Sequence, residues 1–173
     1  MKKCRACQEP FEPFNSMTKA CSVPCALKLV EEKKAKDNRK VNNQAKKALR
    51  ESDRGWWLKQ AQVEFNKYIR NRDSGLPCIS CQRHHKGQIH AGHYRTVGAN
   101  PELRFDERNC HAQCSTCNNH LSGNLINYRS NLLVKIGPGE LSKLEGPHEP
   151  KKYSIPDLRE IRDHYRALNK EIA

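Results

Sequence analysis

Apolar side chains recur at helical spacing in three parts of the chain. The first pattern follows Ser52-Asp53-Arg54-Gly55, where aromatic and aliphatic residues return every three or four positions, as on one face of a helix. Gly75-Leu76-Pro77 ends this pattern. The sequence therefore predicts a helix between these two breaks, with its apolar residues in the core rather than on a base-stacking surface. They are Trp57, Leu58, Ala61, Phe65, Tyr68 and Ile69.

Two further apolar patterns predict helices in the last third of the chain. One occupies Leu121–Ile136 and stops at Gly137-Pro138-Gly139, after which a short helix is expected over Glu140–Leu144. The other begins near Ser154, a residue type that caps helix N-termini, with Pro156 in its first turn. The two apolar faces consist of Leu125, Tyr128, Leu132 and Ile136, and of Leu158, Ile161, Tyr165, Leu168 and Ile172.

The chain between the first and second patterns favours strands. From Gln82 to Arg104 the apolar runs are short, and several glycines and a proline interrupt them. Such a pattern is typical of a β-hairpin with an extended loop. Helices around one small hairpin indicate an α+β fold.

A polar, basic stretch precedes the first apolar pattern. Residues 26–50 contain no glycine or proline, and nine basic side chains stand against three acidic ones. We expect either a solvent-exposed, Lys-rich helix or a partly disordered linker, with almost no apolar stripe. Its cationic side chains, together with Arg95, are candidates for contact with DNA phosphates. The candidates in this stretch are Lys33, Lys34, Lys36, Arg39, Lys40, Lys46 and Lys47.

The whole chain is strongly basic, which narrows the choice of partner. Its 173 residues carry a formal net charge of +13, and the pI is near 9.5. A small chain with this charge is expected to bind a polyanion, of which nucleic acid is the commonest. Charge alone leaves RNA and anionic lipid open. No apolar run approaches the ~18 residues of a membrane span, so we expect no membrane insertion.

Eight of the nine cysteines fall into two sets of four with the spacing of zinc knuckles. Four thiolates close a tetrahedral Zn²⁺ site and leave no position for a substrate, so both ions are expected to be structural. A secreted disulfide framework is the alternative, but no signal-peptide pattern precedes Cys4. We therefore expect a cytoplasmic protein, in the host cytoplasm if a phage encodes it. The sets are Cys4, Cys7, Cys21 and Cys25, and Cys78, Cys81, Cys114 and Cys117.

The cysteine sets and the basic stretch divide the chain into three parts. Residues 1–25 are predicted to form an N-terminal zinc module, residues 26–52 a basic helical linker, and residues 53–173 a larger domain with its own structural zinc. Cys110 is the ninth cysteine, and the sequence assigns no role to it.

Histidines and asparagines gather between and just after the cysteines of the second set. His93 follows a short apolar run, Asn109 lies in the returning loop, and Asn118 comes directly after the last cysteine. Neutral imidazole accepts a proton near neutral pH, so His93 is a candidate general base. The amide oxygen of Asn118 suits a hard cation such as Mg²⁺ or Mn²⁺. His90 and His120 are further candidates for that cation or for a phosphate contact.

The order of these motifs resembles the ββα-metal fold of HNH, or His-Me finger, nucleases. The resemblance rests on Ala91-Gly92-His93-Tyr94, on residues 105–109 and on residues 114–118. Nearly the whole chain is similar to the phage NinG (Rap) recombination family, including Pro77-Cys78-Ile79-Ser80-Cys81 and His120-Leu121-Ser122-Gly123-Asn124-Leu125. The resemblance implies a structure-specific DNA endonuclease that acts on branched intermediates such as Holliday junctions and D-loops.

The resemblance also implies the fold, the cofactors and the roles of the site residues. We expect a small, zinc-stabilised α+β protein in which helices flank an HNH-like nuclease core, with two structural Zn²⁺ and one catalytic Mg²⁺ or Mn²⁺. His93 then deprotonates a water, Asn109 pins the loop that carries it, and Asn118, His90 and His120 are candidate ligands of the catalytic cation. Symmetric cutting of a junction needs two active sites, which favours a homodimer.

Some alternatives stay open. Many HNH nucleases place an acidic residue just before the histidine, whereas Gly92 stands there and His90 lies three positions back. A histidine ligand is softer and favours Mn²⁺ or a later transition metal, unless Asp106 or Glu107 folds back to fill the role. Taken singly, His84, His85 and His90 are more often surface residues than ligands. A non-catalytic double-zinc protein that binds nucleic acid is the alternative function, and a zinc adaptor is a third.

Overall fold

The computed structural model describes residues 1–172 of the chain, which form two compact units. One unit is Met1–Ser52, and the other begins at Asp53. The fold is mixed α and β, mostly helical, with two small two-stranded sheets in the described part. Each unit contains one cluster of four cysteines.

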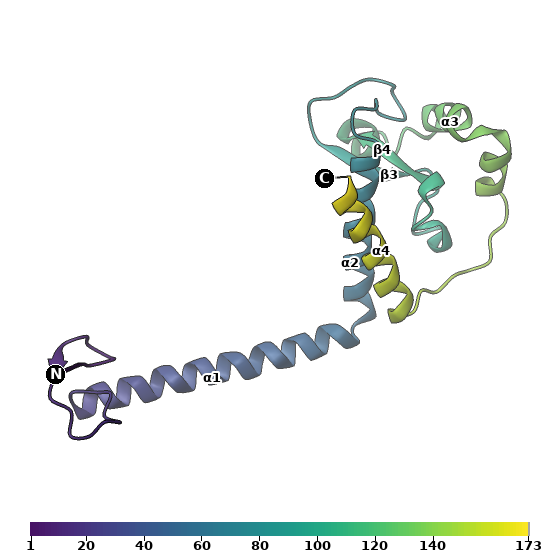
Figure 1. Cartoon of the computed structure of the whole chain (residues 1–173). Coiled ribbons are helices and arrows are strands. Elements are labelled where there is room, and N and C mark those ends of the chain that lie inside the picture. The colour runs from purple at the N-terminus through teal and green to yellow at the C-terminus, as the bar shows by residue number, and fades with distance from the viewer. Residues whose placement is uncertain (173) are drawn as a thin grey trace. The chain divides into compact units, whose positions relative to one another are not determined.

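A short sheet and one long helix make up the first unit (Figure 1). Strands β1 (Lys2–Lys3) and β2 (Pro10–Phe11) pair antiparallel, and helix α1 (Val23–Ser52) follows them. Pro24 lies in the first turn of α1, where a helix has no use for the amide hydrogen that proline lacks. The first unit is therefore a small cysteine-rich module that continues directly into a helix.

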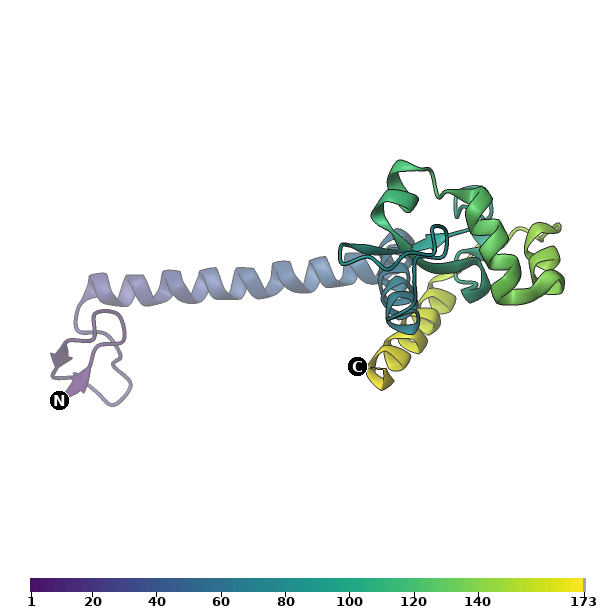
Figure 2. The ribbon, with the colours of Figure 1, turned by 90° about the horizontal axis from the view of Figure 1, so that it is seen from above.

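Helix α1 is exposed along its whole length and runs without a break (Figure 2). None of its 30 residues is buried, which confirms the solvent-exposed helix rather than the disordered linker. Within residues 26–50, the exposed large apolar residues that share one face are Leu27, Val30 and Val41, and Lys34 and Asp37 interrupt them, in agreement with the expectation of almost no apolar stripe. Val23 extends this face because the helix begins before residue 26.

In the second unit, helices α2 (Arg54–Arg72) and α4 (Ile155–Glu171) lie side by side and run in the same direction (Figure 1). Both helices confirm the predictions from apolar spacing. Asp53 caps α2 by accepting a hydrogen bond from the Gly55 amide at 2.7 Å. Ser154 forms a capping box at the start of α4, as its residue type predicts.

Most of the predicted core of these two helices is buried. Leu58, Tyr68, Ile161 and Leu168 are half-buried, and Ile172 is 48% exposed because it lies beyond the end of α4. Arg159 and Arg162 cover the ring of Trp57, each with its guanidinium carbon 4.6 Å from the ring centroid. The buried residues shared by the two helices are Trp57, Ala61, Phe65, Ile69, Leu158 and Tyr165.

The hairpin differs from the prediction in the position of its second strand. Strand β3 (Ile89–His93) pairs antiparallel with β4 (Cys110–Cys114), in a register that sets His93 opposite Cys110. The expected hairpin between Gln82 and Arg104 is therefore wrong for the return strand, which lies beyond it. The long connection contains two short 3₁₀ turns, η1 (Pro101–Leu103) and η2 (Glu107–Asn109).

A π-helical turn and a bent helix follow the hairpin (Figure 2). The turn is η3 (Thr116–His120), and the helix is α3 (Leu125–Glu145). The helix was expected from residue 121 and begins at Leu125, because η3 and a short turn precede it. Its break at Gly137, with φ 82° and ψ 163°, confirms the predicted stop and the second short helix after it.

Helices α2 and α3 cover opposite faces of the β3–β4 hairpin. Phe65 and Ile69 of α2 pack with Cys110, next to Ala91, on one face. On the other face, the hydroxyl of Tyr128 on α3 donates a hydrogen bond to the Gly92 carbonyl at 2.9 Å. The hairpin is therefore the middle layer of the second unit.

A buried carboxylate joins the three layers. Asp73, at the end of α2, is 4% exposed and accepts hydrogen bonds from Arg72 at 2.9 and 3.0 Å and from the Ala112 amide of β4 at 2.9 Å. Lys135 of α3 approaches it at 3.4 Å, and His111 Nδ1 lies 3.5 Å away. Burial alone would raise the pKa of Asp73, but the hydrogen bonds from His111, Arg72 and Ala112 hold it well below its usual range.

No helix among residues 1–172 is both long enough and apolar enough to cross a membrane.

Candidate functional site

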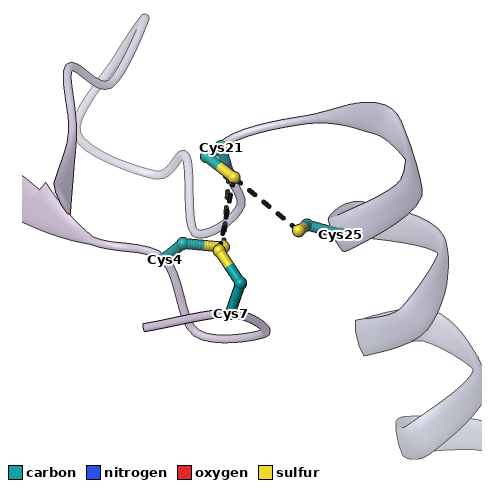
Figure 3. Close-up of side chains that lie close together, drawn as sticks. All are labelled: Cys4, Cys7, Cys21 and Cys25. Atoms are coloured by element: carbon teal, nitrogen blue, oxygen red, sulfur yellow. Dashed lines mark hydrogen bonds between the residues drawn. The ribbon is translucent and has the colours of Figure 1, made fainter. Parts of the chain in front are cut away.

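The four cysteines of the first unit converge on one point (Figure 3). Cys4 follows β1, Cys21 precedes α1, and Cys25 lies in the first turn of α1. All four sulfur atoms lie within 4.8 Å of one another, and Cys21 Sγ is 3.6 Å from both Cys7 Sγ and Cys25 Sγ. Sulfur atoms bound to one tetrahedral Zn²⁺ at ~2.3 Å would be about 3.8 Å apart. The cluster can therefore hold a zinc ion.

The second cluster joins three segments around the hairpin. Cys78 and Cys81 lie in the turn before β3, Cys114 ends β4, and Cys117 lies in η3. Their sulfur atoms also lie within 4.8 Å of one another. The Cys114 amide donates to Cys78 Sγ at 3.3 Å, and the Asn124 side chain donates to Cys117 Sγ at 3.5 Å. Such donors stabilise thiolates, so this cluster can hold a second zinc ion with all four positions filled by protein.

His85 contacts the second cluster, although the sequence favours an ordinary surface position for it. Its Nε2 lies 3.2 Å from Cys81 Sγ, while the ring remains exposed. Burial would raise the pKa of Cys81, but the hydrogen bonds of its sulfur with His85, Arg83 and Cys78 together outweigh this effect and lower the pKa to about 6. In the sequence, the one available signal for this contact was that His85 follows Cys81 by four residues.

His93 is held in one tautomer at the end of β3. Its ring is half-buried, and Nε2 lies 2.9 Å from the Arg104 carbonyl oxygen. A carbonyl only accepts, so Nε2 carries the proton and Nδ1 keeps its lone pair. Burial lowers the pKa of His93 below its ordinary value, which keeps the ring neutral at neutral pH. The imidazole is therefore equipped to accept a proton at Nδ1.

The unassigned ninth cysteine lies beside this nitrogen. Cys110 is fully buried, and its Sγ is 3.7 Å from His93 Nδ1 across the hairpin. Burial raises the pKa of Cys110 well above that of an ordinary thiol, so it stays protonated. Cys110 belongs to neither cysteine cluster and packs against Phe65 of α2.

Asn109 holds the loop that leaves His93. It is fully buried, and its Oδ1 accepts a hydrogen bond from the Arg95 amide at 2.8 Å. Its Nδ2 donates to the carbonyl oxygens of Arg95 at 3.0 Å and Leu103 at 3.2 Å. Three hydrogen bonds thus join this amide to the backbone on either side of the loop, which fixes the end of β3.

The candidate cation ligands do not all lie together. His90 lies three residues before His93 on β3, so the two rings point to opposite faces of the hairpin. Asn118 and His120 lie on η3, where Asn118 is half-buried and His120 is exposed. The amide nitrogen of Asn118 donates to Asn119 Oδ1 at 2.8 Å, which leaves the Asn118 oxygen available to a cation.

The cationic candidates of the first unit share a face only in part. Lys33, Lys36, Lys40 and Lys47 are exposed at spacings of three, four and seven along α1, which place them on one side of the helix. Arg39 and Lys46 lie off this face on one flank of the helix, and Lys34 lies off it on the other flank. In the second unit, the Arg95 side chain is half-buried and donates from Nε to Asn100 Oδ1 at 3.1 Å.

Gln113 is a polar residue that the sequence analysis missed. It is fully buried within β4, between Ala112 and Cys114, which are buried as well. Its Nε2 donates to Ser80 Oγ at 2.7 Å and to the Gly123 carbonyl oxygen at 2.5 Å. A glutamine among buried strand residues was the available signal, but only the strand register shows what lies opposite it.

The family model described as Bacteriophage Lambda NinG protein matches residues 1–173. The chain belongs to the NinG family. It is 37% identical over 187 residues to protein ninG of Escherichia phage 933W, covering 99% of this chain and 93% of that relative. It is 36% identical to the ninG proteins of Salmonella phage P22 and Escherichia phage lambda, each over 96% of this chain and 90% and 89% of those relatives. No solved structure shows significant similarity.

Proposed function

We propose that this NinG-family protein is a metal-dependent DNA endonuclease with an HNH-like core and His93 as its general base. The observation that carries the proposal is the state of His93. Its proton is fixed on Nε2 by the Arg104 carbonyl, and its ring is neutral with an unprotonated Nδ1, which faces the Cys110 thiol at 3.7 Å. The order of β3, β4 and the helical turn η3, clamped by a cysteine cluster, is compatible with a ββα-metal core.

In the proposed reaction, Nδ1 of His93 takes a proton from a water molecule as the water oxygen attacks the phosphorus. The bond from phosphorus to the 3′-oxygen breaks, and that oxygen leaves with a proton from solvent. The products are a 5′-phosphate and a 3′-hydroxyl. Asn109 contributes by holding the backbone after His93, so that the base does not have to be ordered during the reaction.

The residues present offer ligand atoms for a divalent cation, with His90 on the face of the hairpin opposite His93. His90 Nε2 is buried without a hydrogen-bond partner within residues 1–172, and the Asn118 oxygen is available. His90 and Asn118 would hold the cation, with His120 of η3 as a further ligand or a phosphate contact. A bound Mg²⁺ or Mn²⁺ would neutralise the negative charge of the phosphate and the charge that develops on the leaving 3′-oxygen.

The charge distribution supports DNA as the substrate. The basic face of α1, defined by Lys33, Lys36, Lys40 and Lys47, is long and exposed, and its lysines outnumber the acidic residues on the same side, Asp37 and Glu51. Such a face follows a phosphate backbone and carries little sequence preference. The choice of branched DNA, such as Holliday junctions and D-loops, rests on the resemblance to the NinG (Rap) recombination family. Symmetric cleavage of a junction would use two copies of the chain as a homodimer.

The test is cleavage of supercoiled plasmid and of synthetic four-way junctions by the full-length, zinc-loaded protein in Mg²⁺ and in Mn²⁺. His93→Ala should lower the cleavage rate by ~10²–10⁴ while zinc content and DNA binding stay unchanged, because only a base is lost. His84→Ala is the matched control, since His84 is exposed in the loop before β3. Cleavage at the wild-type rate by His93→Ala would show that His93 is not the base.

A non-catalytic double-zinc protein that binds nucleic acid is the second candidate. It is favoured by the packing of His93, whose Nδ1 faces Cys110 Sγ and whose ring lies 6.0 Å from the Phe65 ring. In that case His93 is a structural residue. The wild-type protein then binds junctions and cuts none of them in either metal, and His93→Ala lowers the melting temperature instead.

A further inference from the structure

Two buried polar atoms lack a hydrogen-bond partner in the part of the chain that the structure describes. They are His90 Nε2 on β3 and Gln113 Oε1 on β4. The strand register sets His90 directly opposite Gln113, so their side chains are neighbours on the same face of the hairpin. Unpaired buried polar atoms destabilise a fold, and two of them side by side indicate a ligand that both would bind.

The orientation of Gln113 is fixed by its other end. Its amide nitrogen donates to the Gly123 carbonyl oxygen, which can only accept, and to Ser80 Oγ. The amide group therefore cannot turn over without setting two oxygens against each other. Its Oε1 is left as an acceptor that no protein donor satisfies.

Gly92 makes room for this oxygen. A Cβ atom at residue 92 would lie 2.1 Å from Gln113 Oε1, far closer than any real contact. The oxygen thus occupies the space that a side chain at residue 92 would fill, one residue before His93. Gln113 reaches this place from the neighbouring strand, so an acceptor oxygen lies at the position of residue 92, on the face opposite the His93 ring, although the sequence has no acidic residue there.

We propose that His90 Nε2 and Gln113 Oε1 are both ligands of the catalytic cation, an inference that rests on the proposed nuclease function. Gln113 then takes the place of the acidic residue that many HNH nucleases carry before the histidine. Gln113 then joins His90 and Asn118 as a third ligand, and none of these side chains, one imidazole and two amides, carries a charge. Such a set binds Mn²⁺ or a later transition metal in preference to Mg²⁺, and leaves the cation's charge to be balanced by the DNA phosphate.

The inference is tested by Mn²⁺ binding, which does not require cleavage. Full-length, zinc-loaded protein is titrated with MnCl₂, and free Mn²⁺ is followed by electron paramagnetic resonance. The variants are His90→Ala and Gln113→Met, with His84→Ala as the control. The wild type and the control should bind Mn²⁺ alike, and each of the two variants should bind it at least about 10-fold more weakly.

Zinc content and thermal melting show whether each variant is folded. Gln113→Met loses the hydrogen bonds to Ser80 and Gly123, so it can fail to fold. His90→Ala then decides alone, because the His90 ring makes no hydrogen bond within residues 1–172. Two results would overturn the inference. One is a folded His90→Ala variant that binds Mn²⁺ as tightly as the wild type, which is expected if a water molecule rather than a cation bridges the two atoms. The other is a wild-type protein that binds no Mn²⁺.

Cleavage assays on the same proteins separate this inference from the proposed function. Raised Mn²⁺ should restore the cleavage rate of His90→Ala, which has lost a ligand, and should not restore that of His93→Ala. If the variants lose Mn²⁺ binding but the wild type cuts no DNA, the cation site stands and the nuclease proposal fails. If the wild type cuts DNA and folded His90→Ala binds and cuts like it, the nuclease proposal stands and the ligand assignment fails.

Discussion

The substitution Asp73→Asn tests how the hairpin is attached to α2. The carboxylate of Asp73 is 4% exposed and holds Arg72, the Ala112 amide and Lys135 at 2.9 to 3.4 Å. Asparagine has the same shape, but its amide is neutral, so Arg72 and Lys135 lose the carboxylate that balances their charge. The NH₂ group of the amide, which can only donate, also faces at least one of these two donors. Breaking a buried ion pair costs ~3–5 kcal/mol. Because Arg72 also contacts Glu107 at 3.4 Å and is partly exposed, we expect the low end of that range, about 3 kcal/mol.

Asp163→Asn is a closely matched control. Arg162 and Asp163 are also sequence neighbours, and their two hydrogen bonds of 2.9 and 2.8 Å match those between Arg72 and Asp73. The difference is exposure, since the side chain of Asp163 is 58% exposed. An exposed pair contributes less than about 1 kcal/mol, so this control should change stability little.

The assay is urea denaturation of zinc-loaded full-length protein at pH 7, where the lowered pKa of Asp73 keeps the carboxylate ionised. Both tryptophans of the chain lie on α2, so their fluorescence reports the unfolding of this unit. Asp73→Asn should lower the urea midpoint at unchanged slope and lower the melting temperature by roughly 10 °C. If it loses no more stability than Asp163→Asn, the network does not attach α2 to the hairpin and the reasoning fails.

Three further predictions concern zinc, DNA binding and pH. Replacing Cys78 by serine should unfold the second unit, because structural zinc supplies folding free energy. Metal analysis of the intact protein should find two zinc ions per chain. A folded protein without zinc would contradict the structural role of the cysteine clusters. Neutralising Lys36, Lys40 and Lys47 together should make the salt dependence of DNA binding shallower by roughly one unit per lost phosphate contact, whereas Lys34→Gln alone, off this face, should leave it nearly unchanged. Cleavage should rise with pH as His93 loses its proton, with a midpoint below ~6.5 because burial lowers its pKa. A midpoint above ~7 would contradict this effect of burial.

The helices could be predicted from the sequence because their signals are local. The spacing of apolar residues in α2 and α4, the cap at Ser154 and the break at Gly137 all lie within a few residues of the structure they specify. Strand β4 gave a weaker signal. Apolar and polar residues alternate from Cys110 to Cys114, but over five positions only, and the last cysteine is also the start of the second zinc knuckle, so the segment was interpreted as part of a knuckle turn.

The candidate site could be predicted only where the residue type itself implies the chemistry. Cysteine spacing predicted both clusters, since a thiolate set at knuckle spacing has few other uses. The pairing of His90 with Gln113 depends on strand register, and the contacts of Asp73 join residues from α2, β4 and α3. Neither follows from positions along the chain, because a shift of one residue in the register would set Gln113 against a different partner.

The two faces of β3 decide how a substrate would have to approach. Side chains alternate along a strand, so His90 and Gly92 lie on the face under α3, and His93 lies on the face under α2. A base and a cation on opposite faces of one strand can act on the same phosphate only around its free edge or its end. Gln113 brings its oxygen to Gly92, which reduces the separation along the strand to a single residue. His93 is the last residue of β3, and the backbone beyond it is held by Asn109. The end of β3 is therefore the place where this chain could present a base and a cation to one phosphate, and Arg95, two residues further on, is the nearest cation in the sequence to meet its charge.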